Sequence, residues 1–281
     1  MRKKIVCAVS GGRSSAYCAY LVQNSPKYAD CDKYYVFCNT GQERPETIKF
    51  LSDMVYYWGI PLIMLEGVYS TVKGVGVGFK IVDFDSLNMS SEPLRGALLQ
   101  KNKLTNVGMF NSGLPFCSDY TKKRVTDAWA RSVLGSTDYI KCVGFRKEDM
   151  PKRITFAEIT ADNSRIFPLI TDFDRPQGLQ DLTAFFASQP FQLGLHYNYT
   201  NCTMCWQKTE KQLAEQIKWD RDRNSGNHLS FMLEMMDLYS SSPYYNMYDL
   251  DTIIAMSLDP TRQMSLFDDD ESTGYNCVCS F

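Results

Sequence analysis

The chain has 281 residues, 44% hydrophobic and 22% charged, which is enough for one large α/β domain and excludes a disordered chain. Its formal net charge of −2 excludes a global basic surface, so any nucleic-acid partner would need a local basic patch. No run of about 18 apolar residues occurs, and the apolar run after the basic start is too short for a signal peptide. We therefore expect a cytoplasmic protein without membrane contact.

Strand-like and helix-like segments alternate over the first 66 residues. Short β-rich runs at 4–9, 33–39 and 60–66 are separated by apolar residues at helical spacing, in 14–23 and after Pro45. This alternation is typical of a parallel sheet with helices on both faces. Over about residues 70–111 the pattern predicts an irregular insertion, with a glycine-rich hairpin at 72–84 and loop and short helix in the rest.

Regular patterns return further along the chain. A helix is expected over about 118–134, a strand at 138–144, and more helices near 179–186, 213–217 and 228–239. These elements predict an α/β domain over 1–206, a helical C-terminal part over 207–260, and an acidic tail with a cysteine pair over 261–281.

Small and polar residues separate the first strand from the first helix. The segment "SGGRSS" at 10–15 places two glycines and three serines at this junction. Glycines let a backbone approach an anion, and a helix N-terminus and hydroxyl groups supply hydrogen-bond donors. The segment has neither the Walker A spacing nor the GxGxxG spacing. It therefore predicts a phosphate site of another kind, with an ordinary tight turn as the alternative.

Further segments follow in a consistent order: "VFCNTGQERPET" at 36–47, "GLPFCSDYTK" at 113–122, "GFRKEDMPKR" at 144–153 and "NCTMC" at 201–205. Together with "SGGRSS" they resemble landmarks of the phosphoadenosine phosphosulfate (PAPS) reductase-like family. This family is a branch of the PP-loop ATP pyrophosphatase, or adenine nucleotide alpha hydrolase, superfamily, and the resemblance is closest to its short phage-encoded members. The resemblance implies a HUP-type α/β fold that binds ATP or PAPS, with Mg²⁺, in the host cytoplasm.

The resemblance also implies roles for individual residues. Lys122 and Arg146 would be the catalytic cations. Glu43 would either bind Mg²⁺ through water or cap the helix that begins at Pro45, and Arg13 would face either the phosphates or solvent. The implied nucleotide-binding residues are Ser10, Gly11, Gly12, Arg13, Ser14, Ser15, Asn39, Thr40, Gly41, Glu43, Gly144 and Arg153.

The implied reaction is cleavage of ATP to AMP and pyrophosphate, which would activate an acceptor or support sulfur transfer. The acceptor would be a small metabolite, tRNA or DNA, and homodimers are common in the family. Two departures keep alternatives open: Ser14 replaces the usual aspartate, and the Glu-Cys-Gly-Leu-His segment of true reductases is absent. The alternatives are reduction of PAPS or APS to sulfite, with a thiol donor such as thioredoxin, and a non-catalytic nucleotide sensor.

Ten cysteines is a high number for a cytoplasmic chain. Cys7, Cys18, Cys38 and Cys142 lie in apolar runs and are expected in the core. A Cys-x-x-Cys pair such as the one at 202–205 is typical of a metal or redox site, and thiolates suit a [4Fe–4S] cluster or zinc. The candidate metal ligands are Cys117, Cys202, Cys205, Cys277 and Cys279, and the remaining alternative is that these cysteines bind no metal.

Overall fold

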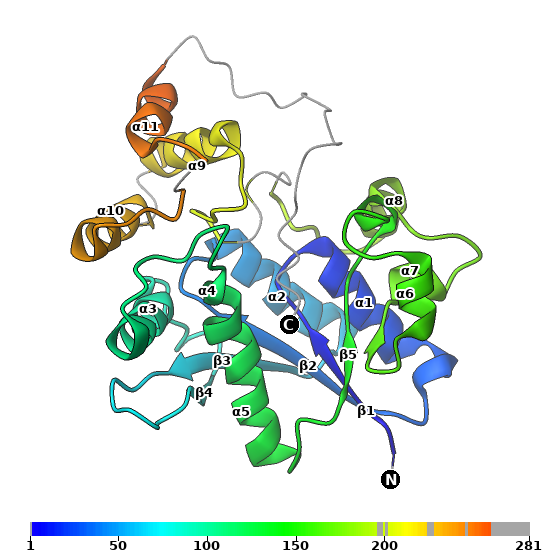
Figure 1. The fold of residues 1–281 in the computed structure, drawn as a ribbon. Helices are drawn as coiled ribbons and strands as arrows, with labels where there is room; N and C mark the ends of the chain where they lie inside the picture. The colour runs from blue at the N-terminus through cyan, green and yellow to red at the C-terminus, as the bar shows by residue number, and fades with distance from the viewer. Residues whose placement is uncertain (1, 196–198, 200–201, 224–227, 245–246, 260–281) are drawn as a thin grey trace.

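The computed structural model describes residues 2–195, 199, 202–223, 228–244 and 247–259 (Figure 1). A six-stranded sheet with the order β4-β3-β2-β1-β5-β6 forms its centre. The β3–β4 pair is antiparallel and the other pairs are parallel, so the fold is mixed α/β and compatible with a Rossmann-like arrangement. The alternating pattern predicts a parallel sheet, and the antiparallel edge strand β4 departs from that prediction. The strands are β1 (Lys4–Ala8), β2 (Asp32–Asn39), β3 (Leu62–Val68), β4 (Gly78–Val82), β5 (Ile140–Cys142) and β6 (Arg165–Ile166).

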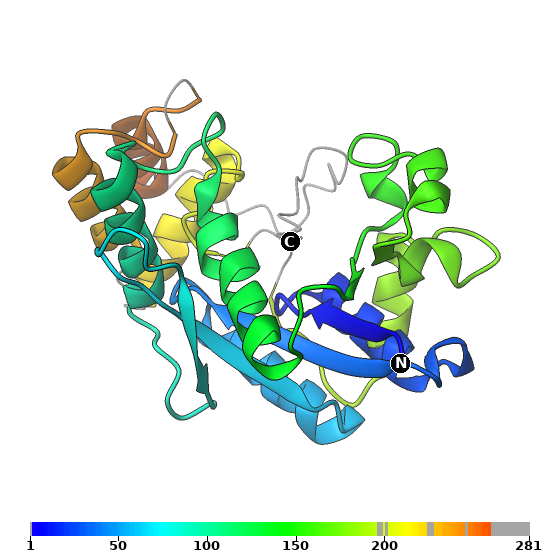
Figure 2. The ribbon, with the colours of Figure 1, turned by 60° about the horizontal axis from the view of Figure 1, so that its bottom comes forward.

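Helices cover both faces of this sheet (Figure 2). Successive side chains of a strand point to opposite faces, so the buried strands are apolar on both sides. Ile5 and Phe37 belong to one core cluster, and Val6 and Val36 belong to the other. The first cluster includes α1 (Arg13–Asn24), α2 (Pro45–Trp58), α7 (Pro168–Thr171) and α8 (Leu179–Ala187), and the second includes α3 (Glu92–Thr105) and α5 (Arg124–Val133).

The segment 70–111 is more regular than the expected insertion. It contains β4 and the 14-residue helix α3, and Leu94, Ala97 and Leu98 of that helix lie in the main core. The glycine-rich run at 72–84 does not form a hairpin by itself, because β4 pairs with β3. The expected hairpin within 72–84 is therefore wrong, and the short helix expected in the rest of the segment is the longer α3.

One continuous helical stretch was expected over about 118–134, and the structure divides it into three parts. The short α4 (Phe116–Ser118) leads into a π-helical segment at Asp119–Lys123, which continues directly into α5. A π-helical turn is rare and occurs often at functional sites. Lys122 lies in this turn, so the irregularity coincides with a predicted catalytic residue.

Three helices near the C-terminus pack together with α3 and α5 in one core cluster. Arg95 of α3 makes a bidentate ion pair with Glu234, which connects α3 to the second of these helices. The three are α9 (Glu210–Asp222), α10 (His228–Tyr239) and α11 (Leu250–Leu258). Within the described residues, no helix combines the length and apolar character needed to span a membrane.

The four cysteines expected in the core are all buried there. Cys7 on β1 is the register partner of Cys142 on β5, and Cys18 lies on α1 above them. Cys38 lies in the opposite cluster, with its Sγ 3.3 Å from Thr126 Oγ1. These thiols therefore act as small apolar side chains that fill the interior.

Candidate functional site

The loops that follow β1, β2 and β5 meet at one edge of the sheet. β1 lies between β2 and β5, and the chain builds outward from β1 in both directions. The carboxyl ends of parallel strands at such a reversal of strand order are the usual ligand site of open α/β sheets. The segments 10–15, 39–44 and 143–153 follow these strands, so the sequence motifs predicted to bind a nucleotide lie at this edge.

Residues 10–15 form a tight turn from β1 into α1. Gly11 has a φ of +77°, and a Cβ placed on it would lie 2.3 Å from Thr47 Cγ2 of α2, so only glycine fits here. The Ser10 N–H donates to Ser15 Oγ over 3.0 Å, and that hydroxyl donates to the Gly12 carbonyl over 3.0 Å. Gly12, at the start of α1, provides no side-chain cap. The first N–H groups of α1 are therefore suited to an anion.

Arg13 packs against the protein. Its guanidinium carbon lies 5.9 Å from the ring centroid of Phe186 on α8, and burial lowers the pKa of the guanidinium. Among the described residues, the buried Nε of Arg13 has no hydrogen-bond partner. Arg13 was expected to face either the phosphates or solvent, and its side chain does not point fully into solvent.

The loop after β5 approaches the turn at 10–15 closely. A Cβ on Gly144 would lie 3.2 Å from the backbone carbon of Ser14 and 3.2 Å from the nitrogen of Ser15. Asp149 then holds two arginines: its carboxylate oxygens lie 3.5 Å from Arg146 Nε and 3.5 Å from Arg153 Nε. Asp149 and Arg146 are buried, and Arg153 is about one-fifth exposed. The two expected anion-binding arginines thus belong to one ion-pair network.

Asn39 ends β2 inside a buried polar network. Its Nδ2 donates to Glu66 Oε1 over 2.6 Å, and its Oδ1 accepts from the Gly41 N–H over 3.0 Å. Glu66 also pairs with Lys80, with Nζ and Oε2 separated by 2.8 Å. Gly41 has a φ of +77°, and a Cβ there would lie 2.7 Å from the Ser91 nitrogen. The loop conformation is therefore fixed by hydrogen bonds and close packing.

Glu43 stabilises its own loop. Its carboxylate accepts hydrogen bonds from Thr40 Oγ1 over 2.8 Å and from the N–H groups of Thr40 and Gln42 over 3.1 Å each. The residue is buried, and the cap position of α2 is taken by Arg44 without a side-chain hydrogen bond. The carboxylate thus makes bonds within segment 40–43 and does not cap α2, while its binding of Mg²⁺ through water stays a prediction.

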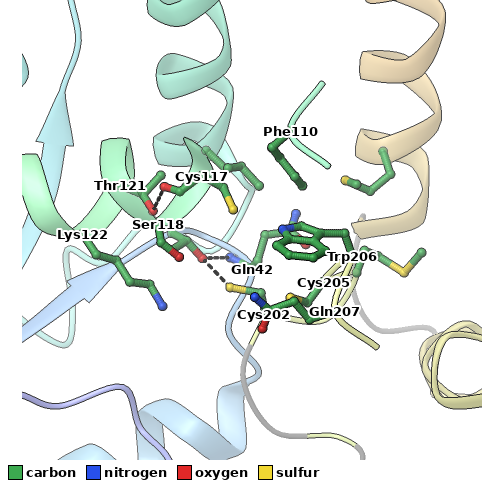
Figure 3. A pocket seen from close by; sticks show the side chains of 14 residues that line it. Gln42, Phe110, Cys117, Ser118, Thr121, Lys122, Cys202, Cys205, Trp206 and Gln207 are labelled. Carbon is green, nitrogen blue, oxygen red and sulfur yellow. Dashed lines mark hydrogen bonds between the residues drawn. The ribbon is translucent and has the colours of Figure 1, made fainter. Parts of the chain in front are cut away.

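The three described candidate ligands line one pocket, which we call the cysteine pocket (Figure 3). It encloses about 480 Å³ including its open mouth, and Cys117, Cys202 and Cys205 contribute to its wall. Apolar side chains such as Trp206 line it together with Thr40 and Lys122. Thr40 Oγ1 lies 3.5 Å from Cys202 Sγ. The pocket therefore adjoins the loop after β2.

The cysteines surround a space and do not converge on one point. Within the described residues, no group of three or more His, Cys, Asp or Glu side chains is arranged to hold a metal ion. A single zinc ion would bring thiolates close together, because each Zn–S bond is about 2.3 Å long. The other two candidates, Cys277 and Cys279, lie outside the described residues. Cys117, Cys202 and Cys205 thus share one pocket, and within the described residues they are not arranged around a single metal ion.

Several residues that organise the site were not singled out from the sequence. Arg44 is buried, and its Nη1 and Nη2 each donate over 2.6 Å, to Asp220 and Gln216 of α9. Glu66 and Asp149 were likewise not singled out, although both organise predicted site residues. Arg44 and Asp149 lie inside the quoted motifs at 36–47 and 144–153, and this position was the available signal for both.

No protein-family model matches the chain. The chain is 26% identical over 209 residues to the "uncharacterized nin region protein ORF290" of Escherichia phage lambda. The match covers 74% of this chain and 68% of the lambda protein. This similarity is compatible with the expected likeness to phage proteins, and it brings no activity with it.

Proposed function

We propose that this chain is a PAPS reductase-like PP-loop enzyme that binds an adenine nucleotide at the carboxyl edge of β1, β2 and β5. One observation carries the proposal: Gly144 meets the backbone of Ser14 and Ser15 where α1 begins without a side-chain cap. Such a junction presents backbone N–H groups and the positive end of a helix to a phosphate. The similarity to a phage lambda protein is compatible with the short phage-encoded members that the motifs resemble.

The reaction we propose is adenylyl transfer. A nucleophile of the acceptor forms a bond to the α-phosphorus of ATP, the bond from that phosphorus to the bridging oxygen of the β-phosphate breaks, and pyrophosphate leaves. Catalysis of such a step consists mainly of positioning and charge stabilisation. Residues 10–15 would hold the β- and γ-phosphates. Lys122 and Arg146 would neutralise the developing charge, with Arg153 and Mg²⁺ assisting.

We propose the cysteine pocket as the metal centre of this enzyme. Cys117, Cys202 and Cys205 would hold a [4Fe–4S] cluster, with Cys277 or Cys279 as the fourth ligand. A bound cluster would supply electron-transfer or sulfur chemistry close to the nucleotide. Whether the acceptor is a small metabolite, tRNA or DNA, it would enter beside Thr40 and Lys122, which line the pocket.

Binding of nucleotides to the purified protein tests the first part. We expect calorimetry to detect ATP or PAPS and to show much weaker binding of GTP. Gly144→Val should abolish binding because its side chain would push the two loops apart. Gly76→Val is the matched control, because a Cβ at Gly76 meets nothing within 4 Å. Absence of binding by either adenine nucleotide, or wild-type affinity in a folded Gly144→Val protein, would overturn the proposal.

Product analysis then separates the activities. Release of AMP and pyrophosphate in the presence of an acceptor supports adenylyl transfer. Sulfite release from PAPS with thioredoxin, abolished by Cys279→Ser, would favour the reductase alternative. Binding without any product for all acceptors would favour a nucleotide sensor.

Anaerobic purification tests the metal centre. We expect about four irons per chain and a broad visible absorption band, as for a [4Fe–4S] cluster. Cys202→Ser should lose the iron, whereas Cys31→Ser should keep it, because Cys31 does not line the pocket. Colourless protein with about one zinc per chain, or with no metal, would refute the cluster.

A further inference from the structure

The loop that carries Cys202 and Cys205 is attached to the loop after β2. The Thr203 N–H and the Thr203 hydroxyl both donate to the Gln42 carbonyl, each over 3.0 Å. Gln42 is in turn held by Ser91, whose hydroxyl accepts from Gln42 Nε2 over 2.6 Å. Two motifs that are about 160 residues apart in the chain thus meet through a few hydrogen bonds.

Arg44 makes a second attachment two residues further along. Its side chain is 3% exposed, and it donates to Asp220 and Gln216, both on α9. Its guanidinium carbon also lies 5.6 Å from the Trp219 ring and 5.9 Å from the Tyr199 ring. Helix α9 begins soon after Cys205, so Arg44 fixes the helix that continues the cysteine loop.

The form of this attachment is unusual for a contact that only stabilises the fold. A buried guanidinium is costly to desolvate, and apolar residues of the same size often stabilise a protein equally well. A planar guanidinium with directed donors instead fixes orientation, since each bond requires a particular angle. The Nε of Arg44 is buried and has no hydrogen-bond partner among the described residues, so the group is not optimised for stability alone.

We propose that Arg44 is a positioning residue that aligns the cysteine loop 202–205 with the nucleotide-side loop 40–43. Arg44 anchors α9, α9 anchors the cysteine loop, and Thr203 completes the connection at Gln42. The identity of the ligands that the two loops bind rests on the proposed function. The alignment itself is a property of the described contacts.

Site-specific alkylation of the full-length protein tests this role. Iodoacetamide is added, and mass spectrometry gives the rate at each cysteine. In Arg44→Gln we expect the rates at Cys202 and Cys205 to rise by about fivefold or more, because the loop opens locally more often. The rates at the buried Cys18 and Cys142 should stay at wild-type values. Arg44→Lys should give an intermediate rate, since lysine cannot make both bonds.

Arg95→Gln is the matched control. It also removes two hydrogen bonds to a carboxylate, at Glu234, and a ring contact, at Phe231, in the same part of the molecule. We expect wild-type alkylation of Cys202 and Cys205 in this variant. Asp220→Asn combined with Arg44→Gln should add little to Arg44→Gln alone, because the Arg44–Asp220 contact is already lost; a remaining close neighbour of the Asp220 carboxylate is His228, with Nδ1 3.5 Å away.

Three results would overturn the proposal: wild-type rates at Cys202 and Cys205 in Arg44→Gln, an equal rise at Cys18 and Cys142, or an equal effect of Arg95→Gln. ATP binding is measured on the same samples. If the wild-type protein binds no adenine nucleotide while the alkylation pattern is as expected, the proposed function fails and the positioning role of Arg44 stands.

Discussion

Gly11 allows the sharpest test of how the turn after β1 is built. Alanine at this position would have to adopt a φ of +77°, and the left-handed region costs a non-glycine residue about 1–2 kcal/mol. Its Cβ would also lie 2.3 Å from Thr47 Cγ2, whereas carbon atoms pack at about 3.5–4.0 Å. Relieving such an overlap typically costs about 1–3 kcal/mol. We therefore expect Gly11→Ala to lower the free energy of unfolding by about 2–5 kcal/mol.

Two further variants separate the contributions. Gly59 has a φ of +63° and open space around the position of a Cβ, so Gly59→Ala should cost only the backbone part, about 1–2 kcal/mol. Thr47→Ser removes Cγ2, which is the atom that an alanine at position 11 would overlap. The double variant Gly11→Ala/Thr47→Ser should therefore lose about 1–3 kcal/mol less free energy of unfolding than the sum of the two single variants. Urea unfolding followed by fluorescence measures all of them. Equal losses for Gly11→Ala and Gly59→Ala, or no recovery with Thr47→Ser, would refute the reasoning.

Three other predictions concern the same edge of the sheet. Ser15→Ala removes the acceptor of the Ser10 N–H and should lower the free energy of unfolding by about 1–3 kcal/mol, measured by urea midpoint against Ser136→Ala in an exposed turn. Arg146→Lys should weaken ATP binding about tenfold because the fork-shaped donor is lost, and calorimetry with Arg165→Lys as control checks this. Burial raises the pKa of Cys38 from 9.0 to about 11, so its contribution to stability is complete below pH 9 and is lost as the pH rises through 11. The stability advantage of wild type over Cys38→Ala should therefore shrink by on the order of 2 kcal/mol across that range, and a constant difference would contradict the assignment.

Local sequence patterns were sufficient to predict the strands and helices around β1 and β2. The expected strand at 33–39 corresponds to Asp32–Asn39, and the expected helix begins at Pro45. Proline is favoured in the first helical turn, because the backbone N–H groups there have no partner within the helix and the missing N–H of proline loses no hydrogen bond. The start of this helix could therefore be predicted from the sequence. The buried cysteines could be predicted for a similar reason, since they lie inside apolar runs.

Contacts between distant segments were not predictable in this way. β4 has the composition of a hairpin arm, but its partner is chosen by the edge of the sheet that β3 leaves open. Helix α3 was expected only as a short helix, although Pro93 at its start and Leu94, Ala97 and Leu98 at helical spacing indicate a longer one. The bond from Arg44 to Asp220 spans 176 residues, and although Arg44 lies in the motif at 36–47, no local pattern identifies Asp220 as its partner.

The loop at 39–44 shows why the roles of individual motif residues could not be predicted from the sequence. Its motif residues were recognised, but Glu43, Asn39 and Gln42 use their side chains on hydrogen bonds to the protein. A loop held by its own bonds has little freedom left to lose when a ligand binds, so more of the contact energy appears as affinity. A motif therefore contains residues that contact the ligand and residues that shape the loop, and sequence alone does not separate them. The hydrogen-bond partners in the structure separate the two kinds of residue. A side chain whose polar atoms are bonded within the protein, such as Glu43, shapes the loop. Substitutions at such a residue should change ligand affinity through the conformation of the loop.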